Sequence, residues 1–177
     1  MTDSSSFKNK NEKNFTNIPE GSEVEFDALF KEEFIKIPEF QTLLNYWTSK
    51  RGDRLFPSRK EINPMDLKEV LPNIFVFELV MQEGHLVDVK AVLLGTAVVD
   101  LYGESTGDSV NSAQDIEVGP RVLSMCQKCI EAQGPMANQV NVLTPGRPHI
   151  SVSSIYCPLS SNGTDIDKII GQVTILQ

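Results

Sequence analysis

The chain has 177 residues, of which 40% are hydrophobic and 23% are charged, as in an ordinary globular domain. Its 16 basic and 24 acidic residues give a net charge of −8 without any basic block, which excludes nucleic acid as the main partner. Three cysteines suit a reducing compartment better than a disulfide framework. No signal peptide and no apolar run of about 18 residues is present, so we predict a cytoplasmic protein with no membrane span.

The first 72 residues are predicted to precede the main domain. Residues 1–22 are polar and are predicted to be a disordered tail, and residues 23–72 to be a helical extension. Apolar side chains recur there at helical spacing in two sets: Phe26, Leu29, Phe30, Phe34 and Ile37, then Phe40, Leu43, Leu44 and Trp47. Gly52 is expected to close the second helix, and Asn63 to cap a short helix from Pro64 to about Val70.

Residues 73–177 have the pattern of one α+β domain. Five strands are predicted, at 74–80, 86–94, 136–143, 149–159 and 168–176. Glu83-Gly84 predicts a hairpin turn between the first two. Two helices, at 97–102 and 120–133, lie between the second and third strands. Short turns between the last three strands favour antiparallel pairing, and the helices must then cover one face of the sheet.

Four segments, in order along the chain, carry a resemblance to a known family. They are Tyr46-Trp47 with Leu55-Phe56-Pro57-Ser58-Arg59; Ile62-Asn63-Pro64 with Leu71-Pro72-Asn73-Ile74-Phe75; Leu94-Gly95-Thr96 with Tyr102-Gly103 and Thr106-Gly107; and Tyr156 with Pro158-Leu159-Ser160. From about Leu44 onward the chain resembles a PAS domain, specifically the single-domain bacterial PAS proteins common in alphaproteobacteria. The resemblance implies a five-stranded antiparallel sheet with flanking helices, a small-molecule pocket between them, and no catalytic residues.

Cys126 and Cys129 have the spacing of a redox or metal motif. A tetrahedral zinc site needs four ligands, whereas only Cys157 remains as a third thiol. Redox cysteines usually begin a helix, where the helix dipole lowers their pKa, but these two lie inside an apolar helical stripe. We interpret them as core residues, with a thiol-based sensor as the alternative.

Cofactor and enzyme motifs are missing from the sequence. PAS proteins that bind haem commonly ligate the iron through a histidine on the long helix; here that helix has none, and His85 and His149 lie beside turns. Residues 100–107 lack the cysteine of the flavin photosensors. No Gly-x-Ser-x-Gly segment or phosphate-binding glycine loop occurs. We therefore predict no cofactor, no metal and no enzymatic activity.

The predicted ligand pocket lies between the inner sheet face and the long helix. The residues expected to line or rim it are Leu101, Tyr102, Arg121, Met125, Cys129 and Tyr156. For the apolar members the alternative is plain core packing. Arg121 either pairs with a carboxylate or phosphate ligand or is simply solvated.

The function predicted from the resemblance is a sensory module that binds an unknown small ligand and contacts a signalling protein. Because no kinase, cyclase or DNA-binding segment follows Gln177, we expect the output to act in trans. The alternative is a ligand-free interaction adaptor. The apolar stripe from Phe40 to Trp47 either packs on its own sheet or forms a homodimer contact.

Overall fold

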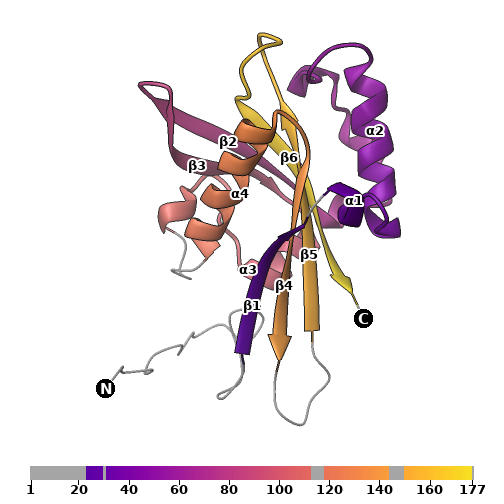
Figure 1. Cartoon of the computed structure of the whole chain (residues 1–177), viewed down its shortest axis with the longest axis vertical. Coiled ribbons are helices and arrows are strands. Elements are labelled where there is room, and N and C mark those ends of the chain that lie inside the picture. Colours follow the sequence, from indigo (N-terminus) through magenta and orange to yellow (C-terminus); the bar gives the residue numbers. More distant parts are fainter. Residues whose placement is uncertain (1–22, 30, 113–117, 144–149, 177) are drawn as a thin grey trace.

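The computed structural model describes residues 23–29, 31–112, 118–143 and 150–176 (Figure 1). Its centre is a six-stranded antiparallel sheet in the order β1-β4-β5-β6-β2-β3. The strands are β1 Glu23–Leu29, β2 Ile74–Gln82, β3 His85–Leu94, β4 Met136–Leu143, β5 Ile150–Leu159 and β6 Lys168–Leu176. The five predicted strands are confirmed, and β1 adds a sixth at the sheet edge. The tail predicted at 1–22 lies outside the described residues.

The α-helices and 3-10 helices (labelled η) flank this sheet. They are α1 Lys31–Phe34, η1 Pro38–Phe40, α2 Gln41–Arg51, η2 Arg59–Glu61, η3 Pro64–Leu67, η4 Leu71–Asn73, α3 Thr96–Tyr102, η5 Val110–Ser112 and α4 Val118–Ala132. Figure 1 shows α2 and α4 on opposite sides of the sheet. Within the described residues, no helix combines the length and the apolar character needed to cross a bilayer.

The helix predicted around Phe26 and Leu29 was wrong, because this segment is strand β1. It pairs with β4 along its length, with Phe26 opposite Val140 and Ala28 opposite Asn138. The apolar positions of so short a segment fit both a helical and a strand period. Pairing with β4 decides between them, since it satisfies backbone groups that an open sheet edge would leave unpaired.

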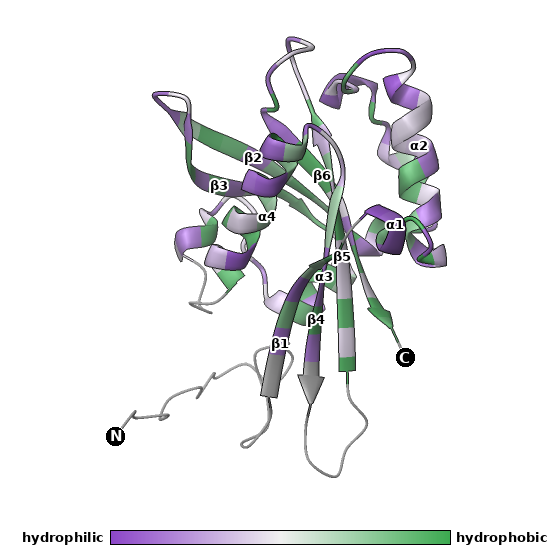
Figure 2. Ribbon diagram, viewed as in Figure 1, coloured by the Kyte–Doolittle hydropathy of each residue, from purple (hydrophilic) through white to green (hydrophobic). Residues whose placement is uncertain are grey.

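The hairpin of β2 and β3 follows from its turn residues and its apolar run. Glu83 and Gly84 have positive φ values of 49° and 79°, as a two-residue hairpin turn of the favoured type requires. β2 is hydrophobic along most of its length (Figure 2). Four consecutive residues of it, from Ile74 to Phe77, are buried, so both faces of this strand are covered.

The apolar stripe of η1 and α2 packs against the chain's own sheet. Phe40 and Leu43 are fully buried, and Trp47 is 4% exposed. The Trp47 indole N–H donates to the carbonyl oxygen of Pro158 in β5 at 2.8 Å. The side-chain amide of Gln172 in β6 donates to the carbonyl oxygen of Glu39 at 2.7 Å. The stripe was predicted either to pack on its own sheet or to form a homodimer contact. The structure shows it packed on its own sheet.

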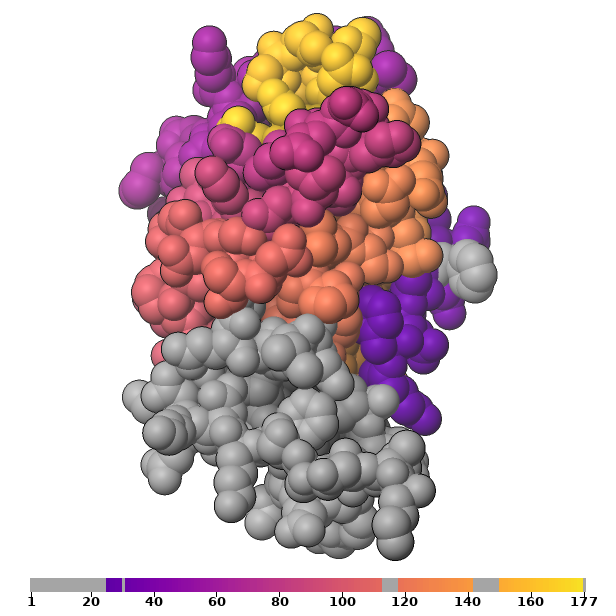
Figure 3. All heavy atoms as spheres, turned by 90° about the vertical axis from the view of Figure 1, so that its left-hand side faces the viewer, coloured from indigo at the N-terminus to yellow at the C-terminus, as the bar shows by residue number. Residues whose placement is uncertain are grey.

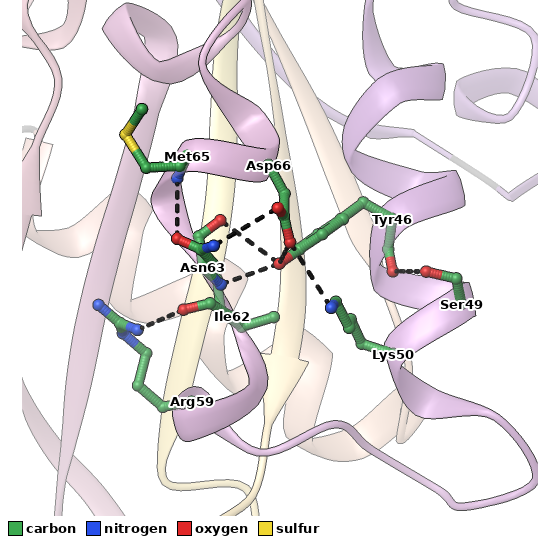
Figure 4. Close-up of polar contacts among 8 residues, drawn as sticks. All are labelled: Tyr46, Ser49, Lys50, Arg59, Ile62, Asn63, Met65 and Asp66. Carbon is green, nitrogen blue, oxygen red and sulfur yellow. Dashed lines mark hydrogen bonds and ion pairs between the residues drawn. The ribbon is translucent and has the colours of Figure 1, made fainter.

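A polar cluster fastens α2 to η3 (Figure 4). Asn63 caps η3 as predicted, since its side-chain oxygen accepts from the backbone N–H of Met65 at 3.1 Å. The Tyr46 hydroxyl accepts from the Asn63 N–H at 2.9 Å and donates to the Asp66 carboxylate at 3.0 Å. Lys50 lies 3.6 Å from the same carboxylate. η3 ends at Leu67, short of the predicted Val70.

The other side of the sheet is covered by α3 and α4. The buried side chains of α4 form one stripe, made of Val122, Met125, Cys126 and Cys129. The helix begins at Val118, two residues before the predicted start, and ends before Gly134 as expected. Gly95 joins β3 to α3 and packs so closely on η4 that a Cβ there would overlap the carbonyl oxygens of Leu71 and Pro72.

Candidate functional site

A cavity of about 240 Å³ lies between the sheet on one side and α3, η5 and the first part of α4 on the other. The sheet contributes Phe75, Phe77, Ala91, Leu94, Asn138, Val140, Ser154, Tyr156 and Val173. The opposite wall is formed by Val98, Tyr102, Gly103, Glu104, Ser105, Asp108, Val110, Ser112, Val118, Arg121 and Val122. Figure 3 shows the outer surface of this wall, where the segment after β3 and α4 lie side by side.

Three aromatic rings form one wall of the cavity. The rings of Phe75 and Phe77 are stacked, with centroids 4.6 Å apart, and the Tyr156 ring meets Phe75 edge-on at 5.1 Å. All three side chains are buried. Aromatic walls of this kind offer ring faces and edges for stacking or edge contacts with a flat ligand.

The cavity also has a buried polar end, which comes from β4 and β5. Asn138 pairs with Ser154 across these strands, and both side chains are buried and line the cavity. Tyr156 lies two residues beyond Ser154 and so projects from the same sheet face. Burial, followed by the neighbouring Cys126 and Tyr102, raises the pKa of the Tyr156 phenol well above 10, so it stays neutral.

The charged lining residues lie on the opposite wall. Glu104 and Asp108 are exposed, and Arg121 is half-buried. The Glu104 carboxylate accepts a hydrogen bond from the backbone N–H of Thr106 at 2.7 Å. Hydrogen bonds from Thr106 lower the pKa of Glu104, which is therefore ionised and tied to its own turn. Charge of both signs is confined to this solvent-facing wall.

The structure brings three of the six predicted site residues together at the cavity, namely Tyr102, Arg121 and Tyr156. Leu101 is half-buried and packs against the core outside the cavity lining. Met125 and Cys129 are fully buried in the core, because they lie in the part of α4 that packs on the sheet beyond the cavity. Sequence reasoning missed Asn138 and Ser154. They could have been found as polar residues at strand positions whose side chains point toward the core.

All three thiols are fully buried. Burial raises the pKa of Cys129 to about 12 and the pKa values of Cys126 and Cys157 well above 9.0. The Cys129 thiol donates to the backbone oxygen of Tyr156 at 3.5 Å. Because the thiolate is the reactive form, these positions favour packing over redox chemistry in the folded chain.

The stability of the chain is expected to fall above pH 9, and Cys129 to account for part of the fall. Its folded pKa is raised above the ordinary 9.0, so its contribution is complete below pH 9 and is lost as pH rises toward about 12. The difference between the folded pKa and the ordinary pKa of Cys129 corresponds to about 4 kcal/mol of unfolding free energy. Urea unfolding at pH 8 and at pH 11 measures how much of this free energy is lost. Between these values, Cys129→Ala should lose about 2–3 kcal/mol less than the unmodified chain. An equal loss in both proteins contradicts the assignment.

Among the described residues, no three His, Cys, Asp or Glu side chains gather closely enough to hold a metal ion. His85 is exposed at the start of β3, and His149 lies outside the described residues. The side chains that line the cavity combine apolar groups with hydrogen-bonding groups such as those of Ser154 and Tyr156.

A family model described as a PAS domain matches residues 35–174. The matched segment contains α2, the cavity residues and nearly all of strands β2 to β6. No curated protein matches the chain.

Proposed function

The chain belongs to the PAS domain family, and from this premise we propose that it binds a small ligand in the cavity and signals in trans through a partner protein. PAS domains are generally sensory and signalling modules. The proposed module works in the cytoplasm of a bacterium and carries no catalytic activity. A ligand-free adaptor that docks a signalling protein is the competing function.

The cavity is the observation that carries this proposal. Its volume of about 240 Å³ is large enough for a small organic molecule, since an apolar cavity of about 150 Å³ holds benzene. Its wall combines buried apolar rings with a few placed polar groups, which is the usual make-up of a ligand site. A chain that worked by surface contacts alone would gain stability by filling this space.

Native mass spectrometry of the protein purified from its own host tests the proposal. We expect a small mass excess that disappears when the protein is denatured, together with the released compound in the supernatant. A protein of ligand-free mass, found in a stable complex with another protein, would favour the adaptor.

A variant that fills the cavity should lose the ligand. Val140 is buried and lines the cavity, so in Val140→Phe the added ring carbons occupy ligand space. We expect ligand affinity to fall at least about tenfold, equivalent to about 1.4 kcal/mol, while the fold survives with a stability change of about 1–3 kcal/mol. Binding is measured by native mass spectrometry and folding by circular dichroism.

Val87→Phe is the matched control for that variant. Val87 is 39% exposed on β3 and lies outside the cavity lining, so the same substitution there should leave the bound ligand in place. Retention of the ligand by Val140→Phe would place the ligand elsewhere.

A further inference from the structure

The side chains that line the cavity include an apolar group on the sheet and a charged group on the opposite wall. The apolar group contains the buried rings of Phe75 and Phe77. The charged group consists of Glu104, Asp108 and Arg121, which are exposed or half-buried. A ligand that suits both groups has an apolar body at one end and charge at the other, because a charge placed among the rings would lose its water without replacement.

Asp108 and Arg121 lie in the same part of the cavity wall, because η5 and the start of α4 are in contact. Gly119 packs so closely on η5 that a Cβ there would overlap the carbonyl oxygen of Val110. Asp108 lies two residues before Val110, and Arg121 lies two residues after Gly119. An acidic and a basic side chain therefore line the cavity on either side of one close contact.

The charge of Arg121 acts toward the interior of the cavity as well as at its exposed side. Burial raises the pKa of the Tyr156 phenol, whereas the positive charge of Arg121 acts on it in the opposite direction. The guanidinium is therefore close enough to the aromatic wall to influence the phenol. Because a guanidinium has five N–H donors in a planar fork, Arg121 can hold a ligand carboxylate beside any contact that it makes within the protein.

The acidic residues make a purely anionic ligand unfavourable. Like charges repel, so a ligand carboxylate needs a positive group beside it to offset Glu104 and Asp108. The Glu104 carboxylate accepts a hydrogen bond from Thr106 and is tied to its own turn. Asp108 is fixed through its backbone, since its carbonyl oxygen accepts from the Ala91 N–H at 3.1 Å and its N–H donates to Ser105 at 3.0 Å. These bonds do not involve its carboxylate, which can accept from a ligand ammonium group.

We propose that the ligand is a small zwitterion of the amino-acid type, whose carboxylate binds Arg121, whose ammonium group binds Asp108 and whose aromatic side chain enters the cavity. This inference rests on the proposed function and specifies its ligand class. The volume of about 240 Å³ lies below the roughly 300–1,000 Å³ of sites for drug-sized molecules, so a side chain with one ring suits it. Phe75 and Phe77 offer that ring stacking or edge contacts. The charged head stays at the solvent-facing wall, so binding does not require full burial of the charges.

Three probes that carry the same ring and differ in charge test this proposal. Phenylalanine has both charged groups, 2-phenylethylamine has only the ammonium group, and 3-phenylpropionate has only the carboxylate. Their binding is measured by calorimetry on the full chain. We expect phenylalanine to bind at least about tenfold tighter than either analogue, equivalent to about 1.4 kcal/mol. An analogue that binds as tightly as phenylalanine, or a failure of all three to bind, overturns the proposal.

Two substitutions assign each charge to its residue. In Arg121→Gln, phenylalanine should lose its advantage over 2-phenylethylamine and keep its advantage over 3-phenylpropionate, and in Asp108→Asn the opposite pattern is expected. Lys128→Gln removes a positive charge from the same helix, and Asp100→Asn a negative charge from α3, both outside the cavity lining. These two control variants should bind all three probes as the unmodified chain does. If either cavity substitution weakens all three probes equally, the assignment is wrong.

Native mass spectrometry separates this inference from the proposed function. An aromatic amino acid, or another aromatic zwitterion, bound to the protein from its host supports both. A bound compound of any other class leaves the proposed function in place and overturns the ligand class. If no compound is bound and no probe binds, both fail.

Discussion

Trp47→Ala is expected to lower the free energy of unfolding by about 3–5 kcal/mol, the usual loss for a large buried side chain replaced by alanine. Trp47 is 4% exposed and joins α2 to β5 through its hydrogen bond to Pro158. Domains of this size are typically stable by only about 5–15 kcal/mol, so the loss is a large share of the total. Urea unfolding followed by circular dichroism measures it.

The geometry of β5 explains why the indole N–H matters as well as the ring. Leu159 accepts a backbone hydrogen bond from Asp167 on the side of β6, so the Pro158 carbonyl points to the other side. On that side no residue of β4 lies opposite Pro158, because β4 begins at Met136, which pairs with Tyr156. Proline has no N–H to leave unpaired at this position, and Trp47 supplies the donor for its carbonyl.

Trp47→Phe is the control that separates packing from hydrogen bonding. Phenylalanine keeps most of the apolar contact but leaves the Pro158 carbonyl without its donor. We expect a loss of about 1–3 kcal/mol, clearly smaller than for alanine. If the two variants are equally destabilised, the hydrogen bond rather than the ring dominates, and the packing argument is wrong.

Gly95→Ala is expected to destabilise the chain by about 3 kcal/mol or more, at the upper end of overpacking effects. The added Cβ would overlap the carbonyl oxygens of Leu71 and Pro72, which are backbone atoms and cannot move aside by changing rotamer. The Gly95 N–H also donates to the Ile74 carbonyl at 2.8 Å, so the overlap is held in place. Thermal and urea unfolding both report the loss.

Gly134→Ala is the matched substitution at an open position. The nearest atom to a Cβ there is the Ala132 carbonyl oxygen at 3.8 Å, an ordinary contact. We expect no loss, or a gain of about 0.4–1 kcal/mol from the less flexible unfolded chain. Equal losses at Gly95 and Gly134 would show that the close approach to η4 is not the cause.

Much of the fold could be predicted from local signals. Turn residues such as Glu83-Gly84 and the cap at Asn63 act within a few residues, so the sequence carries them directly. Strand β1 could not be predicted in the same way, because its conformation depends on pairing with β4 more than a hundred residues away. The role of the α2 stripe likewise required the position of β5 and β6.

The candidate site was only partly predictable, for a reason that lies in α4. Arg121 and Val122 line the cavity, whereas Met125 and Cys129 continue the same helical face into the packed core. Helical spacing identifies a shared face but not where a cavity along it ends. Asn138 was missed because the strand at 136–143 was predicted without assigning which of its faces is buried, although a polar residue on an inward face is itself informative.

The hydrogen bond between Trp47 and Pro158 links the cavity side of the sheet to α2 on its other side. This link matters for how a structural change at the cavity could be transmitted to the surface. Tyr156 touches the cavity on one side of the sheet, and two residues later Pro158 holds α2 on the other side. If a molecule bound in the cavity displaced β5, the displacement would reach the far surface along a single stretch of backbone. Transmission of this kind needs no hinge or mobile loop. The size of the displacement would be limited by how far β5 can slide between β4 and β6.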